Sequence, residues 1–129
     1  MNLSTSAGSS DRRLLELHAA TCRTLAHPTR LALIEALREG ERSVGELVRT
    51  VGTTAANVSQ HLTAMRAAGV LRVRRERRYA FYRIGDRRIL TAFRLMREVL
   101  LARLTRDAQL AERPTIRQGR LPARAASHR

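Results

Sequence analysis

At 129 residues, the chain is long enough for one domain that buries about two thirds of the surface exposed by the unfolded chain. Its 25 basic residues, all of them arginine, outnumber 11 acidic ones, and the net charge of +14 favours a polyanionic partner over a merely basic solvated surface. The single cysteine excludes an intrachain disulfide, and no apolar stretch approaches the ~20 residues that a membrane-spanning helix needs. The first residues, MNLSTSAGSS, lack the cationic and apolar regions of a signal peptide, so we expect a soluble, cytoplasmic protein that is not bound to a membrane.

Two helices are predicted in the first part of the chain. Residues 1–10 are small and polar and are expected to be disordered. From Asp11 to about residue 26, helical spacing relates Leu14, Leu17, Thr21 and Leu25. His27 and Pro28 then fit the N-cap and first position of a second helix, which Gly40 ends. The inner stripe of this helix is predicted to consist of Leu31, Ile34 and Leu37.

The next segment has the pattern of a helix-turn-helix. Ser43 and Glu46 form a capping-box signature for a short third helix, which ends at Gly52 and faces inward with Val44, Leu47 and Val48. Thr54 can cap a fourth helix that extends to Gly69. The joint VGTT between these helices has the length of a helix-turn-helix corner.

The fourth predicted helix has an apolar face and an unusual opposite face. Val58, Leu62 and Met65 recur at helical spacing and are expected to face inward. The other side is small and uncharged, with Ala56, Asn57, Ser59, Gln60, Thr63 and Ala67. Such a face can enter the major groove, where glutamine and asparagine amides pair with adenine.

Beyond Gly69 the apolar period changes from helical to alternating. Leu71 and Val73, and then Tyr79 and Phe81, alternate with arginines and predict two strands that bend between residues 75 and 78. From Asp86 to about Asp107 a long helix is predicted with one apolar stripe made of Ile89, Phe93, Met96, Leu100 and Leu104. A second stripe consists of Ala92, Leu95, Val99 and Ala102, so this helix needs two partners.

The element order predicts a mainly α fold with a small β-hairpin, a winged helix-turn-helix with additional helices at both ends. We expect this domain to occupy residues 11–107, followed by a basic, mobile tail over residues 108–129. The part of the tail from Arg113 to Arg129 contains five arginines and no acidic residue.

Four segments in this order, LAHPTRLALIEAL, GERSVGELV, NVSQHLTAMRAAGVL and RRERRYAFYRI, resemble the ArsR/SmtB family of bacterial repressors. The resemblance covers residues 14 to about 105. It implies that residues 54–67 form the recognition helix and residues 71–83 the wing. It also implies a homodimer joined by the first and last helices, with an interface that includes Leu14, Leu17, Ile89, Phe93, Met96, Leu100 and Leu104.

Double-stranded DNA is therefore the expected partner. In the recognition segment, the residues expected at the interface are Thr53, Thr54, Ala56, Asn57, Ser59, Gln60 and Thr63. Gln60 is the strongest candidate for reading a base. His61 lies nearer the apolar stripe, where it is either a packing histidine or a phosphate contact. On the wing, backbone or minor-groove contacts are expected from Arg74, Arg75, Arg77 and Arg78.

The ligand sets by which this family senses metals are absent from the chain. Ser43 and Gly45 stand where a Cys-x-Cys pair would be needed, and Arg88, Val99 and Ala102 occupy ligand positions of the zinc type. We therefore expect no metal and no cofactor. Cys22 is the remaining candidate sensor, as a thiol that reacts with an oxidant or electrophile, although an ordinary buried thiol also fits its position.

The favoured interpretation is a homodimeric repressor that binds an inverted repeat and is released by a signal. One alternative is a nonspecific architectural protein of nucleic acids, whose binding would depend steeply on salt and little on sequence. Another is a thiol-based repressor that uses Cys22. An enzyme is not expected, because the chain has no phosphate-binding loop, nucleophile elbow or paired catalytic carboxylates.

Overall fold

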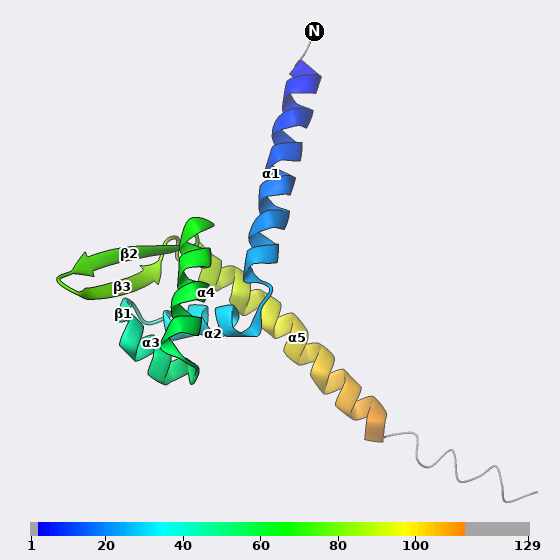
Figure 1. Ribbon diagram of the computed structural model, residues 1–129. Helices are drawn as coiled ribbons and strands as arrows, with labels where there is room; N and C mark the ends of the chain where they lie inside the picture. Colours follow the sequence, from blue (N-terminus) through cyan, green and yellow to red (C-terminus); the bar gives the residue numbers. More distant parts are fainter. Residues whose placement is uncertain (1–2, 113–129) are drawn as a thin grey trace, which may run out of the picture. The chain divides into compact units, whose positions relative to one another are not determined.

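The computed structural model describes residues 3–112, and side-chain environments from residue 8 onward. The elements in chain order are α1 (Leu3–Leu25), α2 (Pro28–Ala36), β1 (Arg42–Ser43), α3 (Val44–Val51), α4 (Ala55–Ala67), β2 (Leu71–Glu76), β3 (Tyr79–Ile84) and α5 (Arg88–Glu112) (Figure 1). The mainly α fold with a small β component is therefore confirmed. The chain divides into two compact units between Leu90 and Thr91, and each unit is described separately.

Local sequence signals begin each of the three central helices as expected. The His27 side chain accepts a hydrogen bond from Thr29 N, and Pro28 follows at the first helical position. Ser43 and Glu46 form both hydrogen bonds of a capping box at α3. Thr54 caps α4 by accepting from Asn57 N, so all three predicted caps are confirmed.

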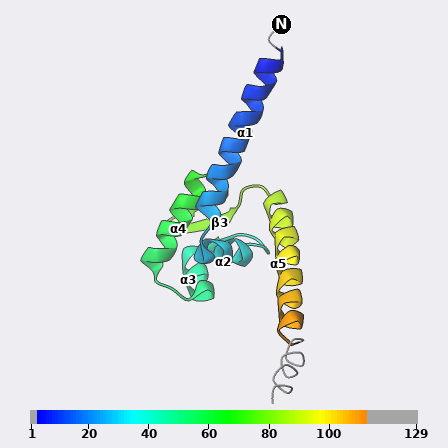
Figure 2. The same ribbon diagram turned by 90° about the vertical axis from the view of Figure 1, so that its right-hand side faces the viewer.

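The core of the first unit lies where α2, α3 and α4 meet the inner face of the sheet, and these three helices lie side by side in Figures 1 and 2. Its fully buried side chains are Leu33, Ile34, Leu37, Leu47, Val58, Leu62, Met65 and Leu71. The predicted inner stripe of α2 was wrong at Leu31, which is 44% exposed, whereas Leu33 is buried. Residues spaced by three drift around a helix, so Leu31 lies about 120° away from Leu37.

The sheet has three antiparallel strands in the order β1-β3-β2. The predicted hairpin is confirmed, and its turn consists of Arg77 and Arg78. The strand β1 was not predicted, because two residues are too few to show an alternating pattern. It pairs Arg42 with Tyr82 of β3.

The two faces of the hairpin carry different side chains. Leu71 lies opposite Ile84 and Val73 opposite Tyr82, so these four side chains share the inner face. Tyr79 and Phe81, the residues from which this strand was predicted, lie on the other face, opposite Glu76 and Arg74. A one-residue change of register moves every side chain of a strand to the opposite face, and here the two-residue turn determines the register.

Both terminal helices are longer than predicted. The helix α1 begins at Leu3 instead of Asp11, because no proline interrupts residues 3–25 and Gly8 costs a helix only about 1 kcal/mol. The helix α5 continues to Glu112, so residues 108–112 are helical and not part of a mobile tail. The remainder of the predicted tail, residues 113–129, lies outside the described residues.

None of the helices within residues 3–112 is long and apolar enough to cross a membrane.

Candidate nucleic-acid interface

The helix α4 has two chemically different faces. Val58, Leu62 and Met65 are completely buried, which confirms the predicted inner stripe. The opposite face exposes the side chains of Ala56, Ser59, Gln60, Thr63 and Ala67. None of these five residues is charged, and the longest polar side chain among them is that of Gln60; the charge on the exposed side of α4 is that of Arg66 in the last turn. An amide on such a face can donate and accept at the edge of a base pair.

The residues that precede and begin α4 hold one another in place. Gly52 ends α3 in the left-handed conformation, with φ of 80°, and thereby turns the chain toward α4. Thr54 Oγ1 accepts from Asn57 N at 3.1 Å, and Asn57 Nδ2 donates to Thr53 Oγ1 at 3.1 Å. The amide of Asn57 is therefore already engaged and half-buried, whereas that of Gln60 is exposed.

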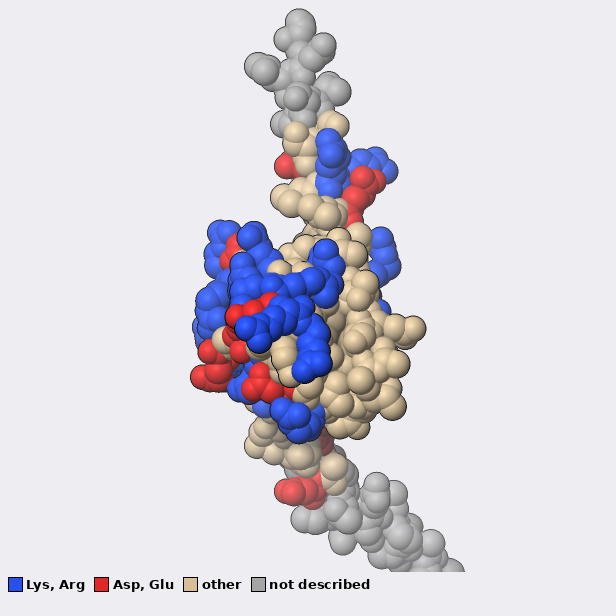
Figure 3. Space-filling model, turned by 60° about the vertical axis from the view of Figure 1, so that its left-hand side comes forward, with Lys and Arg blue, Asp and Glu red and all other residues tan. Residues whose placement is uncertain are grey.

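The hairpin β2–β3 extends from the helices and carries a dense group of basic side chains (Figures 1 and 3). Arg75, Arg77 and Arg78 are exposed at its tip. Arg77 occupies the turn with φ of +58°, a conformation that non-glycine residues adopt rarely. Of the four wing arginines predicted to contact DNA, ion pairs within the described residues engage only Arg74.

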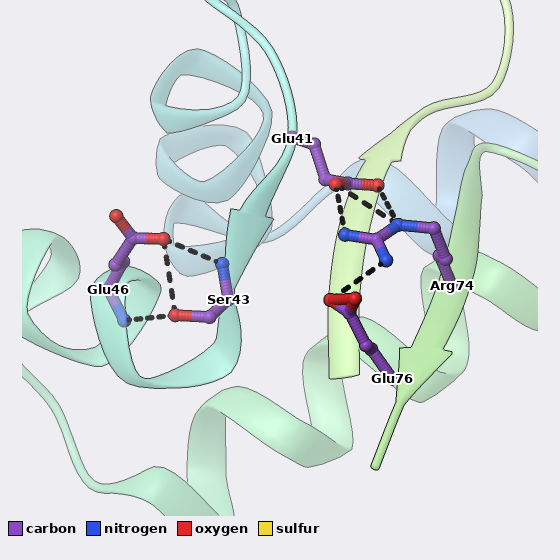
Figure 4. A network of polar contacts seen from close by, with 5 residues as sticks. All are labelled: Glu41, Ser43, Glu46, Arg74 and Glu76. Carbon is purple, nitrogen blue, oxygen red and sulfur yellow. Dashed lines mark hydrogen bonds and ion pairs between the residues drawn. The ribbon is translucent and has the colours of Figure 1, made fainter. Parts of the chain in front are cut away.

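Arg74 is held by two carboxylates (Figure 4) and also lies over an aromatic ring. Its Nη2 lies 2.8 Å from Oε1 of Glu41, its Nη1 lies 3.2 Å from Oε1 of Glu76, and its guanidinium lies 4.6 Å from the centre of the Phe81 ring. The hydrogen bond from Arg74 lowers the pKa of the Glu41 carboxyl. Arg74 thus stabilises the outer face of the sheet. The ion pairs of the described residues include no carboxylate partner for Arg75, Arg77 or Arg78, although the Arg78 guanidinium lies 5.8 Å from the centre of the Tyr79 ring.

Sequence reasoning missed a polar contact on the inner side of α4. Arg30 Nε donates to Nδ1 of His61 at 2.9 Å, and Arg30 Nη1 donates to the carbonyl oxygen of Thr24 at 2.6 Å. His61 is only 8% exposed, so of the two predicted roles the structure favours the packing histidine over the phosphate contact. Burial, and then the nearby His27 and Arg30, lower the pKa of His61. The sequence offered one signal, a histidine on the apolar side of an amphipathic helix.

Cys22 is exposed on α1, so the expectation of a buried thiol was wrong for the single chain. The helix exposes most of the face on which Cys22 was expected to be covered, including Leu14 and Leu17. Within residues 3–112, no three histidine, cysteine, aspartate or glutamate side chains gather in a group that could hold a metal ion.

Comparison of the sequence with known proteins finds a matching domain family and similar transcriptional regulators. A helix-turn-helix domain family matches residues 25–74. Over 95 residues the chain is 41% identical to the HTH-type transcriptional regulator Rv0081 of Mycobacterium tuberculosis, covering 73% of this chain and 82% of that protein. It is 40% identical over 75 residues to the HTH-type transcriptional repressor SmtB of the same species, covering 58% of this chain and 56% of that repressor.

Solved structures agree with the sequence comparison. The crystal structure of Rv0081 matches with a TM-score of 0.67 and 38% identity, covering 74% of this chain and 96% of that one. A second match is the homodimeric winged helix-turn-helix DNA-binding domain of Mb0332 from Mycobacterium bovis, a possible ArsR-family regulator. Its TM-score is 0.66 and its sequence identity 29%, and the match covers 73% of this chain and 87% of that one. These relatives are transcriptional regulators and not enzymes, and the chain belongs to their family, the ArsR/SmtB winged helix-turn-helix regulators that bind DNA.

Proposed function

We propose that this protein is a homodimeric transcriptional repressor that binds an inverted-repeat operator. The recognition helix α4 would enter the major groove with Gln60 at the base edges, and Arg75, Arg77 and Arg78 would contact the DNA backbone or minor groove. The observation that carries this proposal is the exposed polar side chain of Gln60 on α4, beside a wing on which Arg75, Arg77 and Arg78, unlike Arg74, have no carboxylate partner within the described residues.

A homodimer is proposed because the terminal helices expose apolar side chains that a single chain does not cover. Leu14 and Leu17 on α1 are 65% and 63% exposed. On α5, where no described residue is buried, the exposed side chains include Leu95, Met96, Val99, Leu100, Leu101 and Leu104. Contiguous apolar faces of this kind mark protein interfaces.

The action of such a bacterial regulator on DNA also suggests a cytoplasmic location.

The test is fluorescence anisotropy with a labelled duplex from the region upstream of the protein's own gene and with a scrambled duplex, each at two salt concentrations. A preference of about 10³-fold or more that persists at the higher salt concentration is expected of a specific regulator. Equal and strongly salt-dependent binding to both duplexes would instead favour a nonspecific architectural protein or an operator elsewhere.

Release of DNA through Cys22 is a second candidate, favoured by the exposure of this side chain. Oxidation by diamide would then form a disulfide between the Cys22 residues of two subunits and lower operator affinity, and dithiothreitol would restore it. Unchanged affinity after oxidation, with Cys22→Ser as the control, would rule out this mechanism.

A further inference from the structure

The side chain of Arg30 joins three helices. It lies on α2 and donates to the Thr24 carbonyl at 2.6 Å in the last turn of α1 and to His61 Nδ1 at 2.9 Å on α4. Within the described residues, the bond to His61 is the one side-chain hydrogen bond that links α4 to another helix. Arg30 is half-buried and His61 buried, so water competes weakly for this bond.

The Arg30–His61 bond requires a neutral imidazole. Because Nδ1 accepts from Arg30, the proton of the neutral ring lies on Nε2, and a doubly protonated ring has no acceptor. The ring of His27, at the N-cap of α2, lies with its centre 4.4 Å from that of the His61 ring and is tilted by 48° to it. Two charged or titratable groups act on His61, namely His27 and Arg30. Neither is a carboxylate, which could stabilise an imidazolium.

The position of His61 makes this bond relevant to DNA binding. His61 follows Gln60 directly, and the two side chains leave α4 about 100° apart, with Gln60 exposed and His61 buried. A displacement of α4 at His61 therefore displaces the Gln60 side chain as well. We propose that Arg30 is a positioning residue for DNA recognition, which fixes α4 against α1 and α2 through His61 and does so only while His61 is neutral.

This inference rests on the proposed role of α4 in reading DNA, but the fixation of α4 can be measured without DNA. Amide hydrogen exchange of the intact protein is followed by NMR between pH 5 and pH 8, after correction for the intrinsic rates. The expected result is that α4 amides exchange about tenfold faster at pH 5 than at pH 8, while α3 amides change little.

The variant His61→Gln separates titration from packing. The glutamine oxygen can still accept from Arg30 but does not titrate, so the exchange of α4 amides should no longer depend on pH. The variant His27→Asn keeps an N-cap side chain and should retain the pH dependence of the wild type. A pH dependence that persists in His61→Gln would overturn the proposal.

The role in DNA binding is tested at pH 8, where added imidazolium charge cannot contribute to affinity. Arg30→Met should weaken binding to the upstream duplex about tenfold, whereas Arg38→Met, with the same loss of charge at an exposed site, should weaken it much less. Equal affinities of Arg30→Met and Arg38→Met would overturn the inference and leave the proposed function intact. Failure of the wild-type protein to bind either duplex would overturn both.

Discussion

At the scale of single residues, the turn of the hairpin places an arginine where glycine is the usual choice. Arg77 has φ of +58°, whereas Arg78 is not among the residues with positive φ. A left-handed conformation costs an L-residue about 1–2 kcal/mol, and part of this is offset because glycine loses more entropy on folding. The sequence thus keeps an arginine at the wing tip at the expense of stability.

Arg77→Gly should therefore raise the free energy of unfolding by about 0.5–1 kcal/mol while it weakens DNA binding. Because one phosphate contact is lost, the slope of log K against log salt should become less steep by about one, for operator and random DNA alike. Urea denaturation and anisotropy measure the two effects. Arg78→Gly removes the same charge without relieving a positive φ, and an equal gain in stability there would contradict the explanation.

Gln60 is the residue through which base readout is expected. Gln60→Ala should weaken binding to the operator by about 1–3 kcal/mol and leave binding to random DNA unchanged. Anisotropy titrations with both duplexes provide the comparison. Thr50→Ala, a change at an exposed position of α3 outside the expected interface, serves as the control, and an equal loss on both duplexes would show that Gln60 does not read bases.

At the scale of elements, the pairing of Glu41 with Arg74 limits how many arginines the wing offers to DNA. Glu41→Gln removes one of the two carboxylates that hold Arg74. The salt dependence of DNA binding should then steepen by about one phosphate contact, because Arg74 becomes available. Glu39→Gln alters the net charge equally at an exposed site away from these pairs, and the same steepening there would refute the explanation.

The elements also show which features a sequence can predict. Caps at His27, Ser43 and Thr54 are formed by residues two or three positions apart, so their signals are local. One of the two carboxylate partners of Arg74, by contrast, is Glu41, 33 residues away. Strand β1 depends likewise on pairing with β3, which lies far along the chain, and no local pattern reports this pairing. Of the expected interface, Arg74 is therefore the residue whose surroundings the sequence described least well.

At the scale of the whole molecule, the exposed leucines of α1 and α5 predict that the folded state is stabilised by association. Met96 and Leu100 on α5 are 57% and 48% exposed. The double substitution Met96→Glu and Leu100→Glu should produce a monomer in sedimentation experiments. Its operator affinity should fall about 10²-fold or more, because the second half-site no longer binds in the same complex.

The control for this prediction is Thr105→Glu with Arg106→Gln, which introduces the same change in net charge at exposed positions outside the predicted interface. This variant should remain a dimer. A dimer that survives the Met96 and Leu100 substitutions would show that α5 does not join the subunits.

The exclusively arginine composition of the wing has a consequence for covalent regulation. Acetyltransferases neutralise basic DNA-binding surfaces by modifying lysine amines, and this chain has no lysine. Arginine methylation leaves the positive charge in place. The charge of the wing is consequently insensitive to acetylation, and neither of these two modifications can switch off its contribution to DNA affinity.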